Sequence, residues 1–230
     1  MFYGHRKGTS MSRREKYDRI DPLDADLVWS AAFAAFRING DYLKTPEKND
    51  EGNIVKPMNR ELVQLALYDA SMITDQDRKQ AKQARQHISN ATTIEALRGA
   101  LTEWGQISAK VCSLDKIKSN YDMAVITAMP KSYVNSLKKE EVDARLRKCE
   151  GHIGRVGDKV ELYIEVLRHN YSAKFNTWFI SGVSRDNQAV HFAYREAIKP
   201  NQTIQIRGTV KRHTDSSTQL NRVKLVEESK

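Results

Sequence analysis

The sequence predicts an α+β protein in which an N-terminal α-helical domain is followed by a C-terminal five-stranded OB-like β-barrel. Through residues 20–148, apolar residues recur every three or four positions, which is the spacing of amphipathic helices. From Gly151 onward they alternate with polar residues, which is the period of half-buried strands. Five such segments follow one another within about 75 residues, a number and spacing typical of the OB-fold, a small closed or nearly closed barrel. We therefore place the two domains at residues 20–148 and 151–228.

Composition limits the classes of protein to which the chain can belong. Hydrophobic residues make up 40% of its 230 residues and charged residues 29%, as in an ordinary globular protein. The formal net charge of +9 and an isoelectric point near 9.5 favour nucleic acid, an anionic membrane surface or an acidic protein as partner. The sequence has no run of about 18 apolar residues, so we expect no transmembrane segment. Two cysteines, Cys112 and Cys149, are too few for a disulfide framework and favour a cytoplasmic location.

Residues 1–19 are predicted to form a flexible basic arm. They are rich in arginine and lysine, and no long apolar segment follows them. We therefore expect them not to act as a secretory signal.

The helical domain is expected to begin with two helices separated by a polar loop. The first helix spans Ile20–Gly40, with Asp21 as its N-cap and Pro22 at its first helical position. The loop covers Asp41–Met58 and contains two prolines and a glycine. Asn59 is the expected cap of the second helix.

Four more helices are expected before the barrel. Thr74 opens the third in the style of a capping box, and this helix runs to Ser89. Thr93 caps the fourth. Pro130 is expected to separate the last two, because proline removes a helical hydrogen bond; these two helices are Tyr121–Met129 and Ser132–Lys148.

The expected strands are Lys159–Leu167, Thr177–Val183, Ala189–Tyr194, Thr203–Lys211 and Leu220–Val226. If the last two strands pair as a hairpin, four cations lie on one surface, namely Arg207, Lys211, Arg222 and Lys224. Like charges that face one another across strands destabilise a sheet, so we expect an anionic ligand on this face. The alternative is a solvated edge that discourages aggregation.

Aromatic side chains interleave with the cations of the barrel, as in proteins that bind single-stranded nucleic acid. Alternation places Phe192 in the core and Tyr163 on the opposite face, where it could stack on a base. Trp178 and Phe179 are neighbours, so one faces in and the other faces out. The predicted nucleic-acid-binding residues are Tyr163, Tyr171, Lys174, Phe175, Trp178, Tyr194, Arg195, Arg207, Lys211, Arg212, Arg222 and Lys224.

The closing segment, GTVKRH followed by a polar turn and TQLNRVKLV, resembles a C-terminal OB-like module of large bacteriophage proteins. The matching residues are Gly208, Val210, Lys211, His213, Gln219, Leu220, Asn221, Arg222 and Lys224. The helical part is similar to the N-terminal half of such proteins around Asp26–Lys44 and Thr74–Asp77. The resemblance implies single-stranded DNA binding in phage replication, recombination or transcription, in the host cytoplasm, with phage or host proteins of those processes as further partners.

Other functions have less support in the sequence. Cys149 and His152 have the spacing of a zinc-ligand pair, but a structural zinc needs a second pair, so no metal is expected. Motifs of the common hydrolases and nucleotide-binding enzymes are absent, and we expect neither catalysis nor a cofactor. RNA is an alternative ligand to DNA. A different class of function is a protein-interaction adaptor whose basic barrel docks an acidic partner such as a polymerase or helicase. The helical domain could serve partner binding, self-association or an extension of the nucleic-acid track.

Overall fold

The computed structural model describes residues 18–226. The predicted basic arm lies outside this range except for its last two residues, and residues 227–228 of the predicted barrel domain also lie outside it. The chain divides into two compact units, Met1–Ser136 and Leu137–Lys230. The division falls inside a long helix, α6 (Asn120–Arg147), rather than after residue 148. The reason is that Val142 and Leu146 near the end of α6 pack on the barrel.

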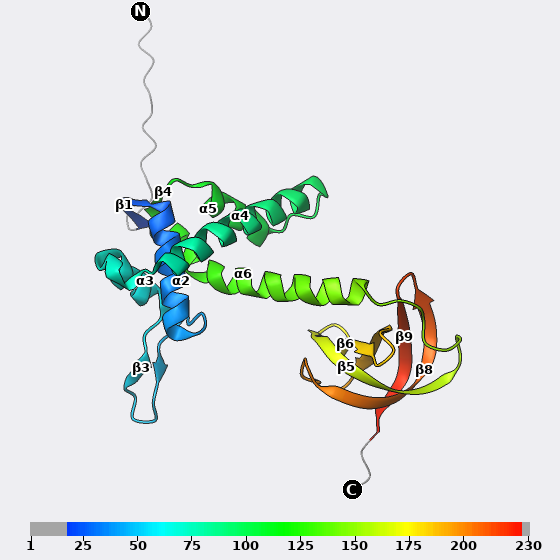
Figure 1. Cartoon of the computed structure of the whole chain (residues 1–230). Helices are drawn as coiled ribbons and strands as arrows, with labels where there is room; N and C mark the ends of the chain where they lie inside the picture. Colours follow the sequence, from blue (N-terminus) through cyan, green and yellow to red (C-terminus); the bar gives the residue numbers. More distant parts are fainter. Residues whose placement is uncertain (1–17, 227–230) are drawn as a thin grey trace, which may run out of the picture. The chain divides into compact units, whose positions relative to one another are not determined.

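The first unit is helical, as predicted, with two short pairs of strands added (Figure 1). Its elements are β1 (Arg19–Asp24), α2 (Ala25–Asn39), β2 (Glu47–Lys48), β3 (Ile54–Lys56), α3 (Asn59–Tyr68), η1 (Ala70–Met72), α4 (Asp75–Leu97), α5 (Glu103–Ser113), β4 (Lys116–Ser119) and the first part of α6. Strand β1 pairs with β4, and β2 with β3.

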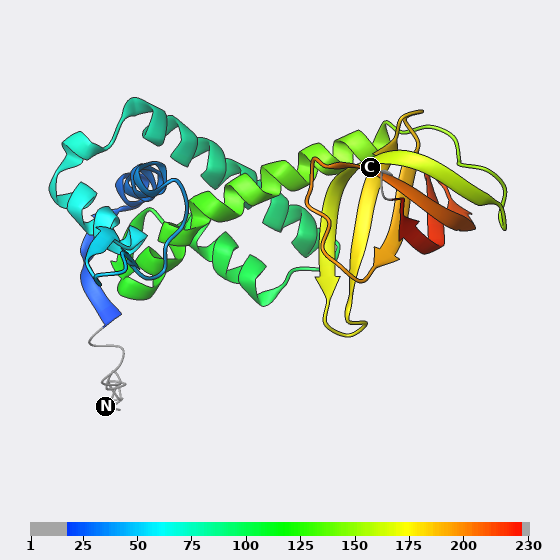
Figure 2. The ribbon, with the colours of Figure 1, turned by 90° about the horizontal axis from the view of Figure 1, so that it is seen from below.

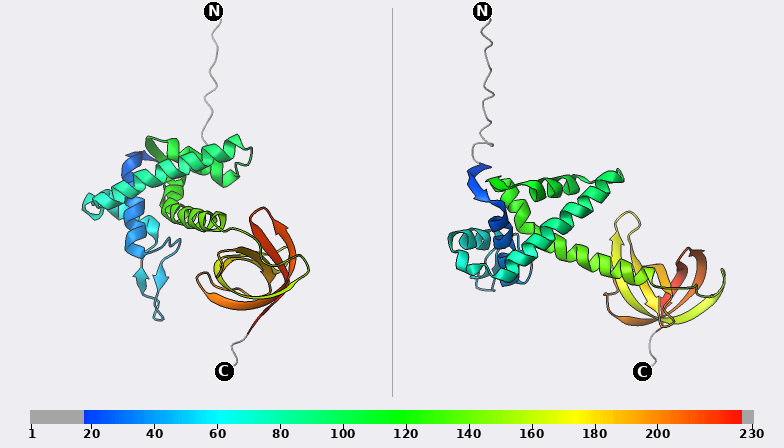
Figure 3. Two further views of the ribbon diagram at one scale, coloured as in Figure 1. Left: turned by 45° about the vertical axis from the view of Figure 1, so that its right-hand side comes forward. Right: turned by 45° about the horizontal axis from the view of Figure 1, so that its top comes forward.

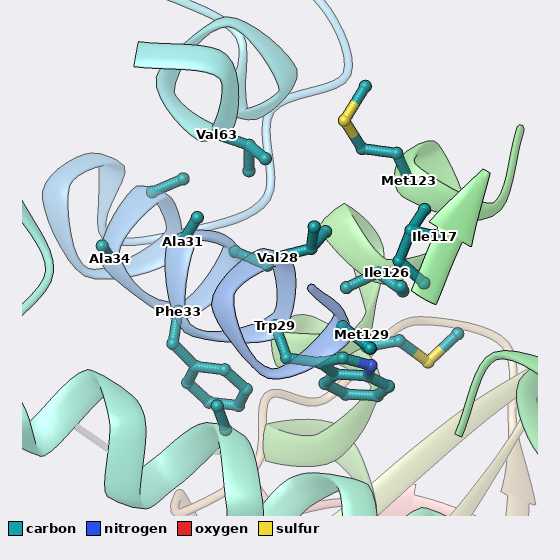
Figure 4. Close-up of a cluster of buried hydrophobic side chains, with 14 of the residues drawn as sticks. Val28, Trp29, Ala31, Phe33, Ala34, Val63, Ile117, Met123, Ile126 and Met129 are labelled. Atoms are coloured by element: carbon teal, nitrogen blue, oxygen red, sulfur yellow. The ribbon is translucent and has the colours of Figure 1, made fainter. Parts of the chain in front are cut away.

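Helix α2 is the centre of this unit. Figure 2 views α2 nearly along its axis, with other helices of the unit around it. Ten of its residues are buried, because the helix is apolar on almost every side. In the core (Figure 4), Val28 and Trp29 belong to one cluster with Val63 of α3 and Met129 of α6.

The start of α2 differs from the prediction. The helix begins at Ala25, and Asp24 rather than Asp21 is its N-cap, accepting a 3.1 Å hydrogen bond from the Leu27 amide. The preceding residues form β1, from which Ile20 and Leu23 pack against the core. Pro22 suits this strand because its partner strand lies on one side only, and proline is tolerated at sheet edges.

Two predicted helix ends are absent. Thr93 does not start a helix. Helix α4 continues to Leu97, and the Thr93 hydroxyl donates to the Ser89 carbonyl at 2.8 Å instead of capping a new helix. Pro130 does not separate two helices, since α6 runs through it. Pro130 is buried beside Ile126 and Met129, and this packing offsets the lost hydrogen bond. Helix α5, capped by Thr102, was not predicted.

The second unit contains the predicted OB-like barrel, shown from two sides in Figure 3. Its strands are β5 (Lys159–Ser172), β6 (Thr177–Ser184), β7 (Ala189–Tyr194), β8 (Thr203–Thr214) and β9 (Ser217–Leu225). They close in the order β5-β6-β7-β9-β8, and β7 and β9 form the one parallel pair of this barrel. The core holds Phe192 as predicted, together with Ile164, Ile180 and Leu220.

Strand β5 must bend where it passes from β8 to β6, and Gly182 makes this bend possible. The β5–β6 register shifts between Val166 and Arg168, which is a bulge at Leu167. A Cβ atom on Gly182 would lie 2.5 Å from the Glu165 carbonyl oxygen, and backbone cannot move aside as a side chain can.

Gly182→Ala is therefore expected to lower the free energy of unfolding of the barrel by about 3 kcal/mol or more. Gly208→Ala is the control, because its Cβ would meet the Val223 side chain at 3.1 Å and that side chain can shift. Urea unfolding of both variants measures the difference. An equal, small loss in the two would contradict the role given to Gly182.

Candidate nucleic-acid interface

The twelve predicted residues do not form one surface. Six of them, Tyr171, Lys174, Phe175, Trp178, Tyr194 and Arg195, lie around the loop between β5 and β6 and the end of β7. Tyr163 and Arg207 lie on the outer face of β5 and β8. The remaining four, Lys211, Arg212, Arg222 and Lys224, lie along the β8–β9 hairpin.

Three aromatic residues form a row across the end of the barrel. Register pairs Tyr171 of β5 with Trp178 of β6, and Trp178 with Tyr194 of β7. The ring centroids of Tyr171 and Trp178 are 5.2 Å apart. Trp178 and Tyr194 pack partly against the barrel core, whereas Tyr171 is 51% exposed. The row therefore leads from the core to the solvent.

A second aromatic pair lies on the other side of β6. Phe175 and Phe179 meet edge to face with centroids 6.1 Å apart, and they are 62% and 42% exposed. The Lys174 ammonium lies 5.5 Å from the centre of the Phe175 ring. Phe179 was not among the predicted site residues, although alternation from the buried Ile180 turns Trp178 inward and Phe179 outward. We call Tyr171, Phe175, Trp178, Phe179 and Tyr194 the aromatic cluster.

Hydrogen bonds hold the loop that carries this cluster. The Tyr171 hydroxyl donates to the Asn176 side-chain oxygen at 2.7 Å. Asn176 has a positive φ of 46°, a conformation that asparagine tolerates better than most residues. The Thr177 hydroxyl donates to the Tyr194 carbonyl at 2.8 Å, which ties the start of β6 to the end of β7. These hydrogen bonds therefore hold in place the loop that carries the exposed rings.

Tyr163 has a different environment. The Arg185 guanidinium carbon lies 3.8 Å from the centre of its ring, so one face of the ring already holds a cation. Register pairs Tyr163 with Gln205 of β8, several residues along β5 from Tyr171. The structure therefore does not bring Tyr163 together with the aromatic cluster.

The β8–β9 hairpin forms, but its cations are less concentrated than regular pairing would make them. Arg207 lies opposite Lys224, and Arg207 donates two hydrogen bonds to Glu161, at 2.7 and 2.9 Å. Register shifts interrupt the alternation on either side of Thr209 and Val210, next to Lys211. Arg222 lies in the first of these irregularities with a φ of 52°. Bulges are common in strongly coiled strands, and a period of two in the sequence does not reveal them.

The end of α6 covers part of the barrel. Val142 and Leu146 pack with Val183 of β6 and Ala189 of β7, on the outer face of these strands. We call residues 137–147 the α6 end. Two ion pairs fasten it, Arg145 to Glu165 and Asp143 to Arg168, the latter at 2.8 Å. Hydrogen bonds from Arg145 hold the pKa of Glu165 below its ordinary value. The outer face of β6 and β7 is the usual ligand face of OB-folds. The α6 end covers this face at Val183 and Ala189, whereas Phe179, toward its other end, is exposed.

Further along the outer face of β6 and β7, Ser181 and His191 form a polar pair. The His191 Nδ1 atom lies 2.9 Å from the Ser181 hydroxyl. Burial lowers the pKa of His191, and the nearby Arg168 lowers it further. His191 is therefore a neutral imidazole at neutral pH and adds no positive charge to the face.

In the described part of the chain, the cysteines and histidines do not form a cluster of metal ligands. Burial raises the pKa of Cys112 to about 11 and also raises that of Cys149, so both remain thiols at neutral pH. The His152 Nε2 atom lies 2.6 Å from the Thr214 carbonyl oxygen, and the His152 ring lies 4.5 Å from that of His213. Among residues 18–226, no three histidine, cysteine, aspartate or glutamate side chains are placed to hold a metal ion.

Within the same range, no helix is long and apolar enough to cross a membrane.

Comparison with known proteins gave no match to any family model, curated protein or solved structure.

Proposed function

We propose that this protein binds single-stranded DNA, largely without base preference, through the aromatic cluster of its barrel. The observation that carries the proposal is the set of exposed rings at the loop end, with Tyr171, Phe175 and Phe179 each more than two-fifths exposed. Large apolar side chains are normally buried, so several exposed together on an ordered support favour a ligand. Base faces are such a ligand, because every base can stack on an aromatic ring.

Charge supports the same proposal. Lys174 and Arg195 flank the cluster and are exposed. The whole chain carries a net charge of +9. Phosphates neutralised by these cations would release counterions, which favours binding and makes it depend on salt. A role in phage replication, recombination or transcription is what the resemblance of the hairpin segment adds to the proposal.

The test is fluorescence anisotropy of a labelled oligo-dT of about 20 nucleotides, longer than the roughly 4–16 nucleotides that one OB-fold covers. A duplex and an oligo-U of the same length are measured in parallel across a salt titration. We expect binding to the single strand and not to the duplex. We also expect the logarithm of the association constant to fall with log[salt] by about 0.7 for each phosphate contact.

Three results would change this conclusion. Equal affinity for duplex and single strand would indicate attraction by charge alone. Tighter binding to oligo-U would make RNA the ligand. Binding to neither at low salt would remove the proposal and leave the adaptor function, in which the basic barrel docks an acidic protein. Under the adaptor function, the purified protein would also show no raised 260/280 absorbance ratio.

A further inference from the structure

A groove lies between the α6 end and the barrel, within the second unit. It has a volume of about 510 Å³. Its walls come from the α6 end, from the β5 bulge and from the loop after β7, and its lining residues include Lys138, Lys139, Val142, Arg168, His169 and Asn201. Both lysines are exposed.

The groove and the aromatic cluster share a wall. His169 lines the groove, and its ring centroid lies 4.9 Å from that of Trp178 in the aromatic row. The His169 Nδ1 atom bonds to the Ile198 carbonyl at 2.8 Å, which fixes the ring between the two. A strand that leaves the aromatic row past His169 would therefore reach this groove.

The charges in the groove have two different roles. Arg168 pairs with Asp143 and Arg145 with Glu165, so these arginines hold the helix on the barrel and are not free to bind a ligand. Lys138 and Lys139 have no ion pair to any residue in the described part of the chain. Glu141 is the carboxylate in the lining and offsets one of them. The lysines are thus the groups that can attract an anion.

We propose that this groove binds the sugar–phosphate backbone of the same strand whose bases stack on the aromatic cluster, with Lys138 and Lys139 as its phosphate contacts. This inference rests on the proposed single-strand binding and extends its site beyond the barrel onto α6. The α6 end, which covers the outer face of β6 and β7, then serves as one wall of the track.

The inference predicts a dependence on strand length. A short oligomer can occupy the aromatic cluster alone, whereas a longer one also reaches the groove. Lys138→Ala/Lys139→Ala in the full chain is therefore expected to leave the affinity for oligo-dT of about 5 nucleotides unchanged and to weaken binding of about 20 nucleotides. At 0.1 M salt, two lost phosphate contacts lower the affinity for the long oligomer by roughly 10- to 30-fold. The slope of log affinity against log[salt] becomes about 1.4 smaller in magnitude.

The control is Lys44→Ala/Lys48→Ala, which removes the same charge from exposed positions of the helical unit. It is expected to leave the slope for the long oligomer within error. An equal effect of the two double variants would overturn the inference, because net charge would then explain both. An unchanged slope for Lys138→Ala/Lys139→Ala would also overturn it while single-strand binding stands. If the wild-type chain binds no oligomer, both proposals fall together.

Discussion

Phe175→Ala is expected to weaken binding of oligo-dT by roughly 5- to 150-fold, the range that corresponds to the loss of one base–aromatic stack of about 1–3 kcal/mol. Phe175 is 62% exposed, and among the described residues its ring contacts are those with Phe179 and Lys174. Truncation there removes little buried surface, so the free energy of unfolding should change by less than about 0.5 kcal/mol. The loss of affinity would then report on the ligand and not on the fold. Anisotropy titrations at one salt concentration measure it.

Tyr163→Ala is the matched control for this prediction. Tyr163 is an aromatic residue of the same barrel, but its ring face is covered by Arg185 and it lies away from the aromatic cluster. We expect its replacement to change affinity less than 3-fold, which corresponds to about 0.6 kcal/mol. The reverse order of effects, with Tyr163 important and Phe175 silent, would move the binding surface to the outer face of β5 and β8.

The barrel could be predicted from the sequence because each of its strands has one face in the core. Alternation from Ala189 to Tyr194 places Val190 and Phe192 inward, and the observed β7 has these same bounds. The register shifts at Leu167 of β5 and on either side of Thr209 and Val210 of β8 could not be predicted in this way. A bulge such as the one at Leu167 depends on a neighbouring strand, here on the absence of a side chain at Gly182, which lies far along the sequence.

The helical unit was harder because the same residue type can end a helix or lie inside one. Pro130 and Thr93 are both signals of a helix boundary in isolation. In the structure the packing around Pro130 and the back-bonded hydroxyl of Thr93 make them interior residues. The candidate nucleic-acid interface could also not be predicted in full. No local sequence pattern indicates that the α6 end lies on the barrel face or that His169 lies between the aromatic row and the groove.

The sequence did predict the Thr74–Asp77 capping box, and the structure adds a partner that the pattern could not indicate. Asp77 is fully buried and accepts hydrogen bonds from the Thr74 amide and hydroxyl at 2.9 and 2.7 Å. Arg37 near the end of α2 also donates to both carboxylate oxygens of Asp77, from Nε to Oδ1 and from Nη2 to Oδ2, each at 3.0 Å. One carboxylate therefore completes the capping box of α4 and binds α4 to the central helix.

Asp77→Ala is expected to lower the free energy of unfolding of the helical unit by about 2–4 kcal/mol. The variant loses the Asp77 half of the capping box and charge-assisted hydrogen bonds worth about 1.5–3 kcal/mol, and it leaves the Arg37 guanidinium without its carboxylate. Asp75→Ala is the control, because it removes the same charge from the same first turn at an exposed position. Urea unfolding followed by helical circular dichroism measures both, and equal losses would mean that Asp77 acts only through the helix dipole.

The same carboxylate makes the stability of the helical unit depend on pH. Burial alone would raise the pKa of Asp77, but the hydrogen bonds from Arg37 and Thr74 outweigh it and hold the pKa below its ordinary value. Because the folded pKa is the lower one, the stabilisation is complete above the unfolded pKa of about 3.9 and is lost as the pH falls through the folded pKa. The difference in unfolding free energy between wild type and Asp77→Asn should therefore be constant from neutral pH to about pH 5 and shrink at lower pH. A difference that stays constant down to the acid transition would show that Asp77 is not the group whose protonation weakens the α2–α4 contact.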